Sequence, residues 1–204
     1  MDKLKFIGFI ILLFCALSVN AQVYIPHNHV YYVQSALNYG KNPYGCWDIK
    51  GSDVKFKNGQ SIVVWQLSDK QDDRKFQMAY IQSSGDKYLY IILPKYAKGW
   101  GRVDVAGGSS NNGTNIHMWE RNSSSAQKFW FKHMGNGRFK IYNVNGKVLC
   151  LDQQKSDNGT NVHLWSDNNA TSTQWYLIDV QTNQAYVPPV KKTKRVIFEK
   201  RLFL

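Results

Sequence analysis

The chain has 204 residues, of which 43% are hydrophobic, 14% aromatic and 20% charged, and it holds three cysteines. A fully disordered chain would be poorer in aromatic residues and a disulfide-dense mini-scaffold far richer in cysteine, so we exclude both classes and expect one compact domain. The formal net charge of +12 divides into +1 on residues 1–21, +6 on residues 22–182 and +5 on the last 22 residues, so the body of the chain is only mildly basic.

The N-terminal segment, residues 1–21, has the pattern of a secretory signal peptide. Lys3 and Lys5 precede an apolar run from Phe6 to Val19, and residues of small or medium size end the segment at Ala21. This order predicts cleavage and a secreted or extracytoplasmic protein. The alternative is a membrane anchor, but about 14 apolar residues fall short of the roughly 20 that span a bilayer. We therefore expect no membrane span.

Cysteine and histidine usage gives no sign of a metal site. Cleavage would leave Cys46 and Cys150, which could form a disulfide or remain as two buried thiols, since spacing alone does not show whether they lie within reach. Apart from His27 and His29, the five histidines are scattered along the chain, without metal-ligand spacing. We expect neither a metal nor a cofactor.

An internal repeat dominates the rest of the chain. The template N-G-x-x-[I/V]-x-x-W occurs three times, at residues 58–65, 112–119 and 158–165. An opening that ends in aspartate precedes each copy, and an aromatic residue follows each template tryptophan after ten or eleven positions; the openings are Cys46-Trp47-Asp48, Arg102-Val103-Asp104 and Cys150-Leu151-Asp152, and the aromatic residues are Phe76, Phe129 and Trp175. These landmarks define a repeat of about 50 residues.

The local pattern of each repeat is typical of strands. Runs such as Tyr31–Val33, Leu89–Ile91 and Phe139–Ile141 are rich in aromatic and β-branched residues, and Asn-Gly and Gly-Asp turns separate them. Each unit holds about four short strands, and no stretch of the mature chain has a sustained helical period. Propellers need four or more such units, whereas three can close as a β-trefoil. We predict an all-β fold, a β-trefoil of three repeats.

At these residues the sequence resembles the ricin B-chain-type lectins, whose repeats carry a Q-x-W signature. The matching positions are Arg74-Lys75-Phe76, Gln127-Lys128-Phe129 and Thr173-Gln174-Trp175, of which one keeps the glutamine and one the tryptophan. The resemblance extends from near Tyr31 to near Ile178. It implies a lectin domain over residues 23–182, followed by a basic tail over residues 183–204.

Strand alternation places a polar side chain beside each template tryptophan. In Val162-His163-Leu164-Trp165, the two aliphatic residues face inward while His163 and Trp165 share the outer face, and residues 116–119 repeat this pattern. An indole can support the C–H face of a pyranose while a carboxylate accepts hydrogen bonds from its hydroxyls. The resemblance assigns these roles to Asp104, His117 and Trp119 in the second repeat and to Asp152, His163 and Trp165 in the third.

Other interpretations of these residues remain open. The tryptophans could serve packing alone, the aspartates could cap turns, and the histidines could be ordinary surface residues. In the first repeat the equivalent residues are Asp48, Val63 and Trp65, and Val63 cannot hydrogen-bond, so we expect no working site there. The asparagine that precedes the Q-x-W glutamine in the resembled lectins is absent, although Asn122 and Asn168 lie in the same segments.

The sequence favours a binding protein over an enzyme. No nucleophile elbow, H-E-x-x-H motif or phosphate-binding loop is present, and a glycosidase needs two positioned carboxyl groups, whereas Glu120 is the domain's single glutamate. We expect glycans as partners, with weak sites that gain avidity together, and no specific nucleic acid. The alternative is a trefoil scaffold whose basic tail binds an anionic surface, or a trefoil that binds a protein partner such as a proteinase.

Overall fold

The computed structural model describes residues 23–27, 29–41, 44–51, 56–67, 74–97 and 99–189. The expected signal peptide, residues 1–21, lies outside these ranges, as do residues 190–204 of the expected basic tail. Within the described residues, no helix is long and apolar enough to cross a membrane.

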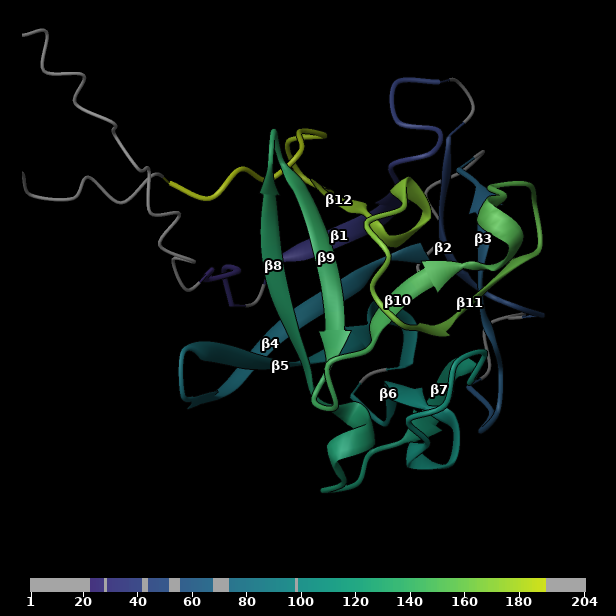
Figure 1. Cartoon of the computed structure of the whole chain (residues 1–204), viewed down its shortest axis with the longest axis vertical. Coiled ribbons are helices and arrows are strands. Elements are labelled where there is room, and N and C mark those ends of the chain that lie inside the picture. Colours follow the sequence, from purple (N-terminus) through teal and green to yellow (C-terminus); the bar gives the residue numbers. More distant parts are fainter. Residues whose placement is uncertain are drawn as a thin grey trace, which may run out of the picture.

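The described chain is all-β (Figure 1), as the sequence predicted. Its strands are β1 (Val30–Ser35), β2 (Gly45–Ile49), β3 (Ile62–Gln66), β4 (Phe76–Ser84), β5 (Lys87–Pro94), β6 (Gly101–Val105), β7 (Ile116–Glu120), β8 (Phe129–Gly135), β9 (Arg138–Asn143), β10 (Val148–Leu151), β11 (Thr160–Trp165) and β12 (Trp175–Asp179). Short 3-10 turns lie between some of them, at η2 (Lys95–Ala97), η3 (Ala106–Gly108), η4 (Ser125–Gln127), η5 (Asp152–Gln154) and η6 (Thr171–Thr173).

Half of the strands close into a barrel. Strand β1 pairs with β12 and β4, β9 pairs with β12 and β8, and β5 pairs with β8 and β4, so the ladder returns to its start. Three pairs of buried aromatic residues lie opposite each other across neighbouring strands of the barrel: Tyr31–Phe76, Tyr90–Phe129 and Phe139–Trp175. The strand-like runs of the sequence thus pair directly with the aromatic residues that follow each template tryptophan.

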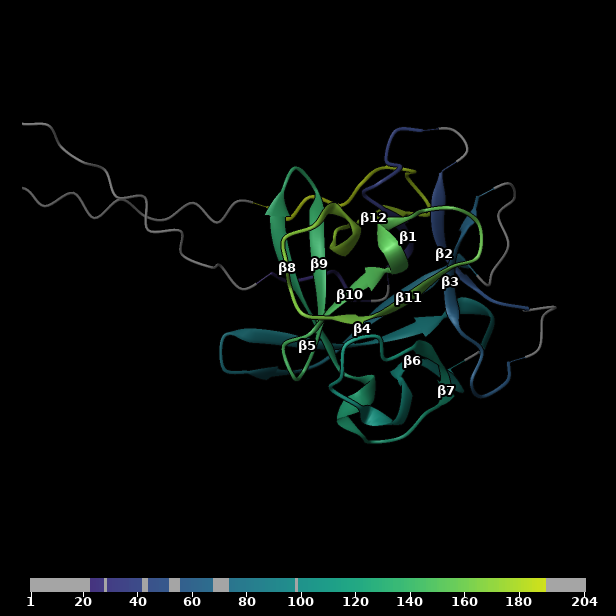
Figure 2. The ribbon, with the colours of Figure 1, turned by 45° about the vertical axis from the view of Figure 1, so that its right-hand side comes forward.

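The remaining strands form three antiparallel hairpins, β2–β3, β6–β7 and β10–β11, which lie next to one another in both ribbon views (Figures 1 and 2). The inward residues of the hairpins are fully buried, among them Ile116, Met118, Val162 and Leu164. Trp47 of β2 packs edge-on against Trp175 of the barrel, with ring centroids 5.5 Å apart. Burial of these side chains fixes which face of each hairpin points outward.

The Asn-Gly turns of the template tie the three hairpins into a cycle. Asn58 Oδ1 accepts the N–H of Glu120 at 2.7 Å, Asn112 Oδ1 that of Ser166 at 2.9 Å, and Asn158 Oδ1 that of Gln66 at 2.8 Å. The glycine after each asparagine has φ between +81° and +86° and donates to the carbonyl of the same neighbouring hairpin at 2.8 Å. Each template turn therefore caps the second strand of the next hairpin by hydrogen bonds, and the turn of the third hairpin caps the second strand of the first.

The segment that follows β12 also packs on the domain. Tyr186 packs against the core, its N–H bonds the carbonyl of Leu177 at 2.8 Å, and its hydroxyl bonds that of Tyr24 at 2.8 Å. Contacts of the domain thus continue past residue 182. Cys46 and Cys150 are both buried, and they do not form a disulfide with each other.

Candidate functional site

The β6–β7 hairpin brings together the residues predicted for the second repeat. Asp104 lies directly opposite His117 in the strand register, and His117 Nε2 is 3.2 Å from Asp104 Oδ1. The imidazole stacks on the indole of Trp119, with ring centroids 5.2 Å apart and planes inclined by 23°. The carboxylate and imidazole are buried, whereas the indole is 36% exposed. The result is an accessible aromatic surface beside a fixed pair of hydrogen-bonding groups.

Further residues, which the sequence analysis missed, extend this face. Arg102 lies opposite Trp119, and just beyond the strands the N–H of Arg121 donates to the carbonyl of Trp100 at 2.8 Å. Trp100 is the most exposed tryptophan of the described chain, at 65%, and the guanidinium of Arg121 lies 5.2 Å from its ring centroid. Their positions follow from the same two-residue alternation that placed Asp104 and Trp119 on one face.

The third repeat keeps the aromatic part of this arrangement and changes the polar part. His163 stacks on Trp165 with centroids 5.5 Å apart, and the indole is 39% exposed. The residue opposite His163 is Cys150, so Cys150 occupies the register position that Asp104 has in the second repeat. Asp152 comes two residues later, half-buried at the start of η5. The sequence alignment of Asp152 with Asp104 therefore does not hold in the strand register.

Asp152 nevertheless acts electrostatically on this hairpin. Burial lowers the pKa of His163, and the negative charge of Asp152 opposes that shift. Burial also raises the pKa of Cys150 to about 12, with Asp152 contributing in the same direction. The carboxylate thus lies close enough to affect both groups, while the Cys150 thiol stays protonated and is a weak hydrogen-bonding group.

In the first repeat, an arginine engages the aspartate. Arg74 Nε forms an ion pair with Asp48 Oδ2 at 2.5 Å, both side chains are buried, and Arg74 Nη1 donates to the carbonyl of Gln66 at 3.1 Å. Val63 lies opposite Asp48, and Trp65 is 42% exposed. An exposed indole is present here, but the carboxylate beside it is neutralised by a residue of the chain.

The Q-x-W positions have structural hydrogen bonds. Gln127 is fully buried, donates to the carbonyl of Glu120 at 2.9 Å and accepts the N–H of Asn122 at 3.1 Å. Asn122 and Asn168 each use Oδ1 to accept a backbone N–H two residues later. The glutamine thus connects the segment after β7 to the start of β8, and the asparagine oxygens stabilise local turns.

A charged cluster lies beyond the third template tryptophan. Asp167 is bound by Lys140 and by the hydroxyl of Tyr142, and Lys140 also donates to Asn169 at 2.8 Å. Burial alone would raise the pKa of Asp167, but the hydrogen bonds from Lys140 and Tyr142 outweigh it and hold that pKa below its usual value. The carboxylate of Asp167 is therefore already compensated.

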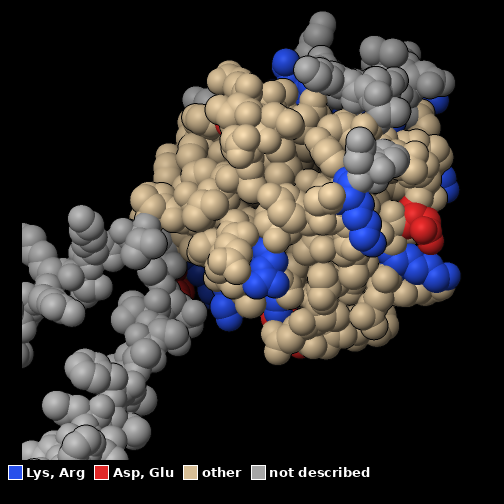
Figure 3. Space-filling view, turned by 90° about the horizontal axis from the view of Figure 1, so that it is seen from above, with Lys and Arg blue, Asp and Glu red and all other residues tan. Residues whose placement is uncertain are grey.

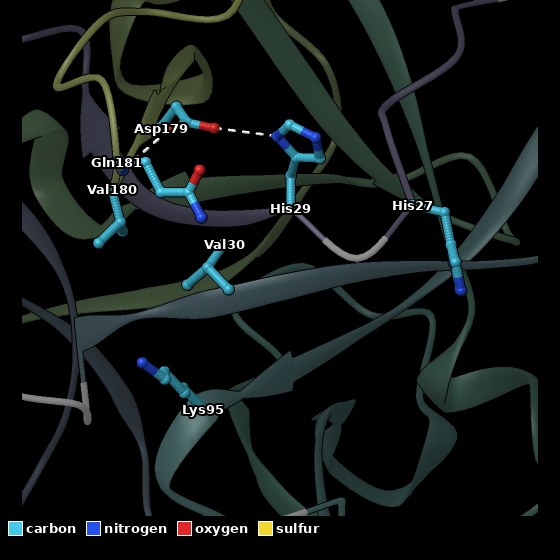
Figure 4. A pocket seen from close by; sticks show the side chains of 7 residues that line it. All are labelled: His27, His29, Val30, Lys95, Asp179, Val180 and Gln181. Carbon is cyan, nitrogen blue, oxygen red and sulfur yellow. Dashed lines mark hydrogen bonds and ion pairs between the residues drawn. The ribbon is translucent and has the colours of Figure 1, made fainter.

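A cavity of about 350 Å³ lies elsewhere, at the start of β1 and the end of β12 (Figure 4). His29 Nδ1 bonds Asp179 Oδ2 at 3.0 Å at one end, and Lys95 approaches from the opposite side. Burial would raise the pKa of Asp179, but hydrogen bonds from His29 and from the Thr182 and Gln181 N–H groups hold it below its usual value. The carboxylate of Asp179 thus has its partners within the domain.

Among the described residues on the face shown in Figure 3, Lys and Arg form separate small groups on a largely uncharged surface. In the part of the chain that the structure describes, no three His, Cys, Asp or Glu side chains are grouped so that they could hold a metal ion.

Comparison with sequence families and curated proteins gives one family. Residues 72–165 and 125–197 match a family model described as "Ricin-type beta-trefoil lectin domain-like", so the two matches together cover more than half of the chain. No curated protein matches significantly.

Solved structures agree on the fold. The designed threefold-symmetric protein ThreeFoil superposes with a TM-score of 0.64 at 18% identity, covering 74% of this chain and 99% of ThreeFoil. The Rhizoctonia solani agglutinin gives 0.61 at 17%, covering 78% and 99%. The exo-β-1,3-galactanase of Clostridium thermocellum gives 0.65 at 20%, with 77% of this chain matching 31% of the galactanase. At these identities the likeness concerns the fold alone.

Proposed function

The chain belongs to the ricin-type β-trefoil lectin domain-like family, and from that premise we propose that it is a secreted carbohydrate-binding protein with shallow sites on β6–β7 and β10–β11. Both hairpins present an indole to solvent beside buried polar groups. Secretion rests on the N-terminal sequence pattern.

The proposal includes a β-trefoil architecture of three repeats of about 50 residues, with about four strands each. The closed ring β1-β12-β9-β8-β5-β4, the three hairpins and the cyclic Asn-Gly contacts support it. In this architecture the three hairpins are equivalent scaffolds, and the side chains on their outward faces decide which of them binds sugar.

The observation that carries the function is the group Asp104, His117 and Trp119. The indole offers a flat apolar surface to the C–H face of a pyranose, and the carboxylate is an acceptor for hydroxyl groups at the edge of the ring. The cross-strand hydrogen bond to His117 holds the carboxylate in place before a ligand arrives, which lowers the conformational entropy lost on binding. The second repeat is the stronger of the two proposed sites.

The third repeat offers the same aromatic surface with weaker polar support. Trp165 and His163 correspond to Trp119 and His117, but Cys150 stands where the second repeat has an aspartate. Asp152 would supply the carboxylate from the following turn. In the first repeat, Asp48 is already paired with Arg74, and we propose that this hairpin does not bind sugar.

We also propose that the protein catalyses no reaction on the bound sugar. A glycosidase places two carboxyl groups on either side of the scissile bond. Here each proposed site has one carboxylate, Asp104 or Asp152, and the two belong to different hairpins.

A glycan array followed by calorimetry on the mature protein tests the function. Trp119→Ala and Trp165→Ala should each weaken glycan binding, the first more strongly, and the double variant should abolish it. Trp65→Ala is a matched control, because it removes an indole of similar exposure whose neighbouring carboxylate is already engaged, and it should bind like wild type. The assignment is wrong if the double variant and wild type bind the same glycans with equal affinity.

A further inference from the structure

The outward face of β6–β7 has three rungs of aromatic and charged side chains, of which the first is buried. The first rung is Asp104 with His117, the second is Arg102 with Trp119, and the third is Trp100 with Arg121, just past the strand ends. Diagonal cross-strand neighbours such as Trp119 and Trp100 lie about 7–8 Å apart between Cα atoms. Two indoles at this spacing can contact neighbouring rings of one oligosaccharide.

The two arginines on this face lack acidic partners. Within the described residues, neither Arg102 nor Arg121 forms an ion pair. Arg102 Nη1 donates to the carbonyl of Asn122 at 3.2 Å, and its buried Nε has no hydrogen-bond partner among the described residues. Burial lowers the pKa of Arg102, and the like charge of Arg121 adds to this shift. Two neighbouring cations, one of them partly desolvated, form a site that an anionic group would stabilise.

The acidic residues nearby do not compensate these cations. Asp104 lies one rung away and is hydrogen-bonded to His117. Glu120 occupies the alternate position of its strand, in line with the inward-facing Ile116 and Met118, so it lies off the outward face. The positive charge is therefore concentrated at one end of the face, and the carboxylate for hydroxyl groups at the other.

This arrangement is confined to the second repeat. Cys46 is opposite Trp65 in the first repeat and Val148 is opposite Trp165 in the third, where the second repeat has Arg102. Two positions after the tryptophan, where the second repeat has Arg121, the third has Asp167, which is bound to Lys140. The three hairpins thus share the indole and differ in charge.

We propose that the β6–β7 face binds an acidic saccharide, with its carboxylate or sulfate group on Arg102 and Arg121 and its sugar rings on Trp119 and Trp100. This inference rests on the proposed carbohydrate binding and adds the class of ligand. Guanidinium groups suit such ligands because their planar donors match carboxylate and sulfate oxygens in pairs. A neutral part of the same ligand would meet Asp104 and His117.

The experiment uses the full mature chain and probes that differ only in charge. Oligogalacturonates are compared with their methyl esters, and sulfated dextran oligosaccharides with their desulfated forms, on an array and by calorimetry. We expect at least one charged form to bind about tenfold or more tightly than its neutral partner. The double variant Arg102→Gln/Arg121→Gln should remove that preference, so that the charged and neutral partners bind with equal affinity. The uronate and sulfate pairs show which anionic group is preferred.

A matched control separates this site from general attraction to the basic tail. Lys191→Gln/Lys192→Gln removes the same number of positive charges and should keep the preference for the charged form. Trp165→Ala should also keep it, because the preference belongs to the second repeat. Trp100→Ala should weaken oligosaccharides more than monosaccharides.

Several outcomes would overturn the inference. Equal affinity for charged and neutral partners would refute it while leaving carbohydrate binding intact, whereas failure to bind any glycan would refute the proposed function as well. An equal loss in the arginine and lysine double variants would assign the attraction to net charge. Binding of a deoxythymidine oligonucleotide as tight as that of the saccharide, with the same dependence on the arginines, would indicate a surface for nucleic acid instead.

Discussion

Substitution of Asn112 by alanine tests whether the template turns hold the three hairpins together. Asn112 Oδ1 accepts the N–H of Ser166 at 2.9 Å, the hydroxyl of Ser166 at 3.1 Å and Nζ of Lys147 at 2.8 Å. All three bonds cross from the second repeat to the third. Removal of the Asn112 amide leaves the donors of Ser166, at the end of β11, and of Lys147 without this acceptor. Water can reach these donors because the site is exposed.

The expected cost follows from this exposure. A typical net contribution is about 0.5–1.5 kcal/mol per hydrogen bond, and groups that water can resolvate lie at the low end, so Asn112→Ala should lower the free energy of unfolding by about 1–2 kcal/mol. For a chain of this size that corresponds to a fall in Tm on the order of 2–8 °C. Asn58→Ala and Asn158→Ala each remove one such bond and should cost about half as much.

Urea unfolding and calorimetry of matched variants give the measurement. Asn111→Ala is the control, because Asn111 is the adjacent exposed asparagine and its side chain makes no cross-hairpin bond among the described residues. It should unfold at the same urea concentration as wild type. If Asn112→Ala and Asn111→Ala unfold at the same urea concentration, the contacts between the template turns and the neighbouring hairpins contribute nothing to stability.

Four further predictions concern the residues of the three hairpins and of the segments next to them. Gln127→Leu leaves two backbone groups unpaired in a fully buried position, so the free energy of unfolding should fall by about 2–6 kcal/mol, and an unchanged urea midpoint would contradict the structure. Arg74→Gln leaves Asp48 buried without its cation and should cost about 3–5 kcal/mol, much of it recovered when Asp48→Asn is added; no recovery would mean that the cost is not electrostatic. Burial lowers the pKa of His163, so as the pH falls below about 6.5 the unfolded state binds the proton before the folded state does, and the free energy of unfolding decreases until the pH reaches the folded-state pKa. His163→Gln should therefore reduce the slope of Tm against pH in this range. An unaltered slope would exclude His163 as its source. Cys150, with a pKa of about 12, should resist iodoacetamide in the native state, as mass spectrometry of its peptide would show, and rapid labelling would contradict its burial.

Most of the fold could be predicted from residue patterns, because those patterns come from the residues that form the strands, the turns and the buried core. The alternation in residues 162–165 correctly predicted buried Val162 and Leu164 and an exposed Trp165. The Asn-Gly turns were recognised as turns, but their role between hairpins was not, since a contact from Asn112 to Ser166 depends on how the three hairpins are arranged around the barrel. Local sequence signals strands and turns, while long-range hydrogen bonds appear only once the chain has closed.

The candidate site was predicted less completely, for two physical reasons. Asp152 was matched to Asp104 by residue type, whereas strand pairing counts positions, and Cys150 is the residue opposite His163. The separation from Asp104 to His117 equals that from Cys150 to His163, and this spacing could have indicated the register. The second reason is that a side chain from outside the motif can occupy a site, as Arg74 does for Asp48.

The three hairpins show that scaffold and site are under separate physical constraints. The asparagine–glycine turn, the buried inward apolar residues and the outward indole occur in all three hairpins, and the asparagine of each turn accepts a hydrogen bond from the next hairpin. The residue opposite the histidine position differs among the hairpins. It is Asp48, paired with Arg74, in the first, Asp104, hydrogen-bonded to His117, in the second, and Cys150, whose thiol stays protonated, in the third. The hairpin strands that carry these outward side chains are not part of the ring β1-β12-β9-β8-β5-β4, so the three faces can differ in charge on the same barrel. One chain can therefore carry the face that we propose for acidic saccharides on β6–β7, the face that we propose for neutral sugars on β10–β11, and a β2–β3 face whose carboxylate is paired with Arg74, and a substitution in the outward side chains of one hairpin should leave the other two intact.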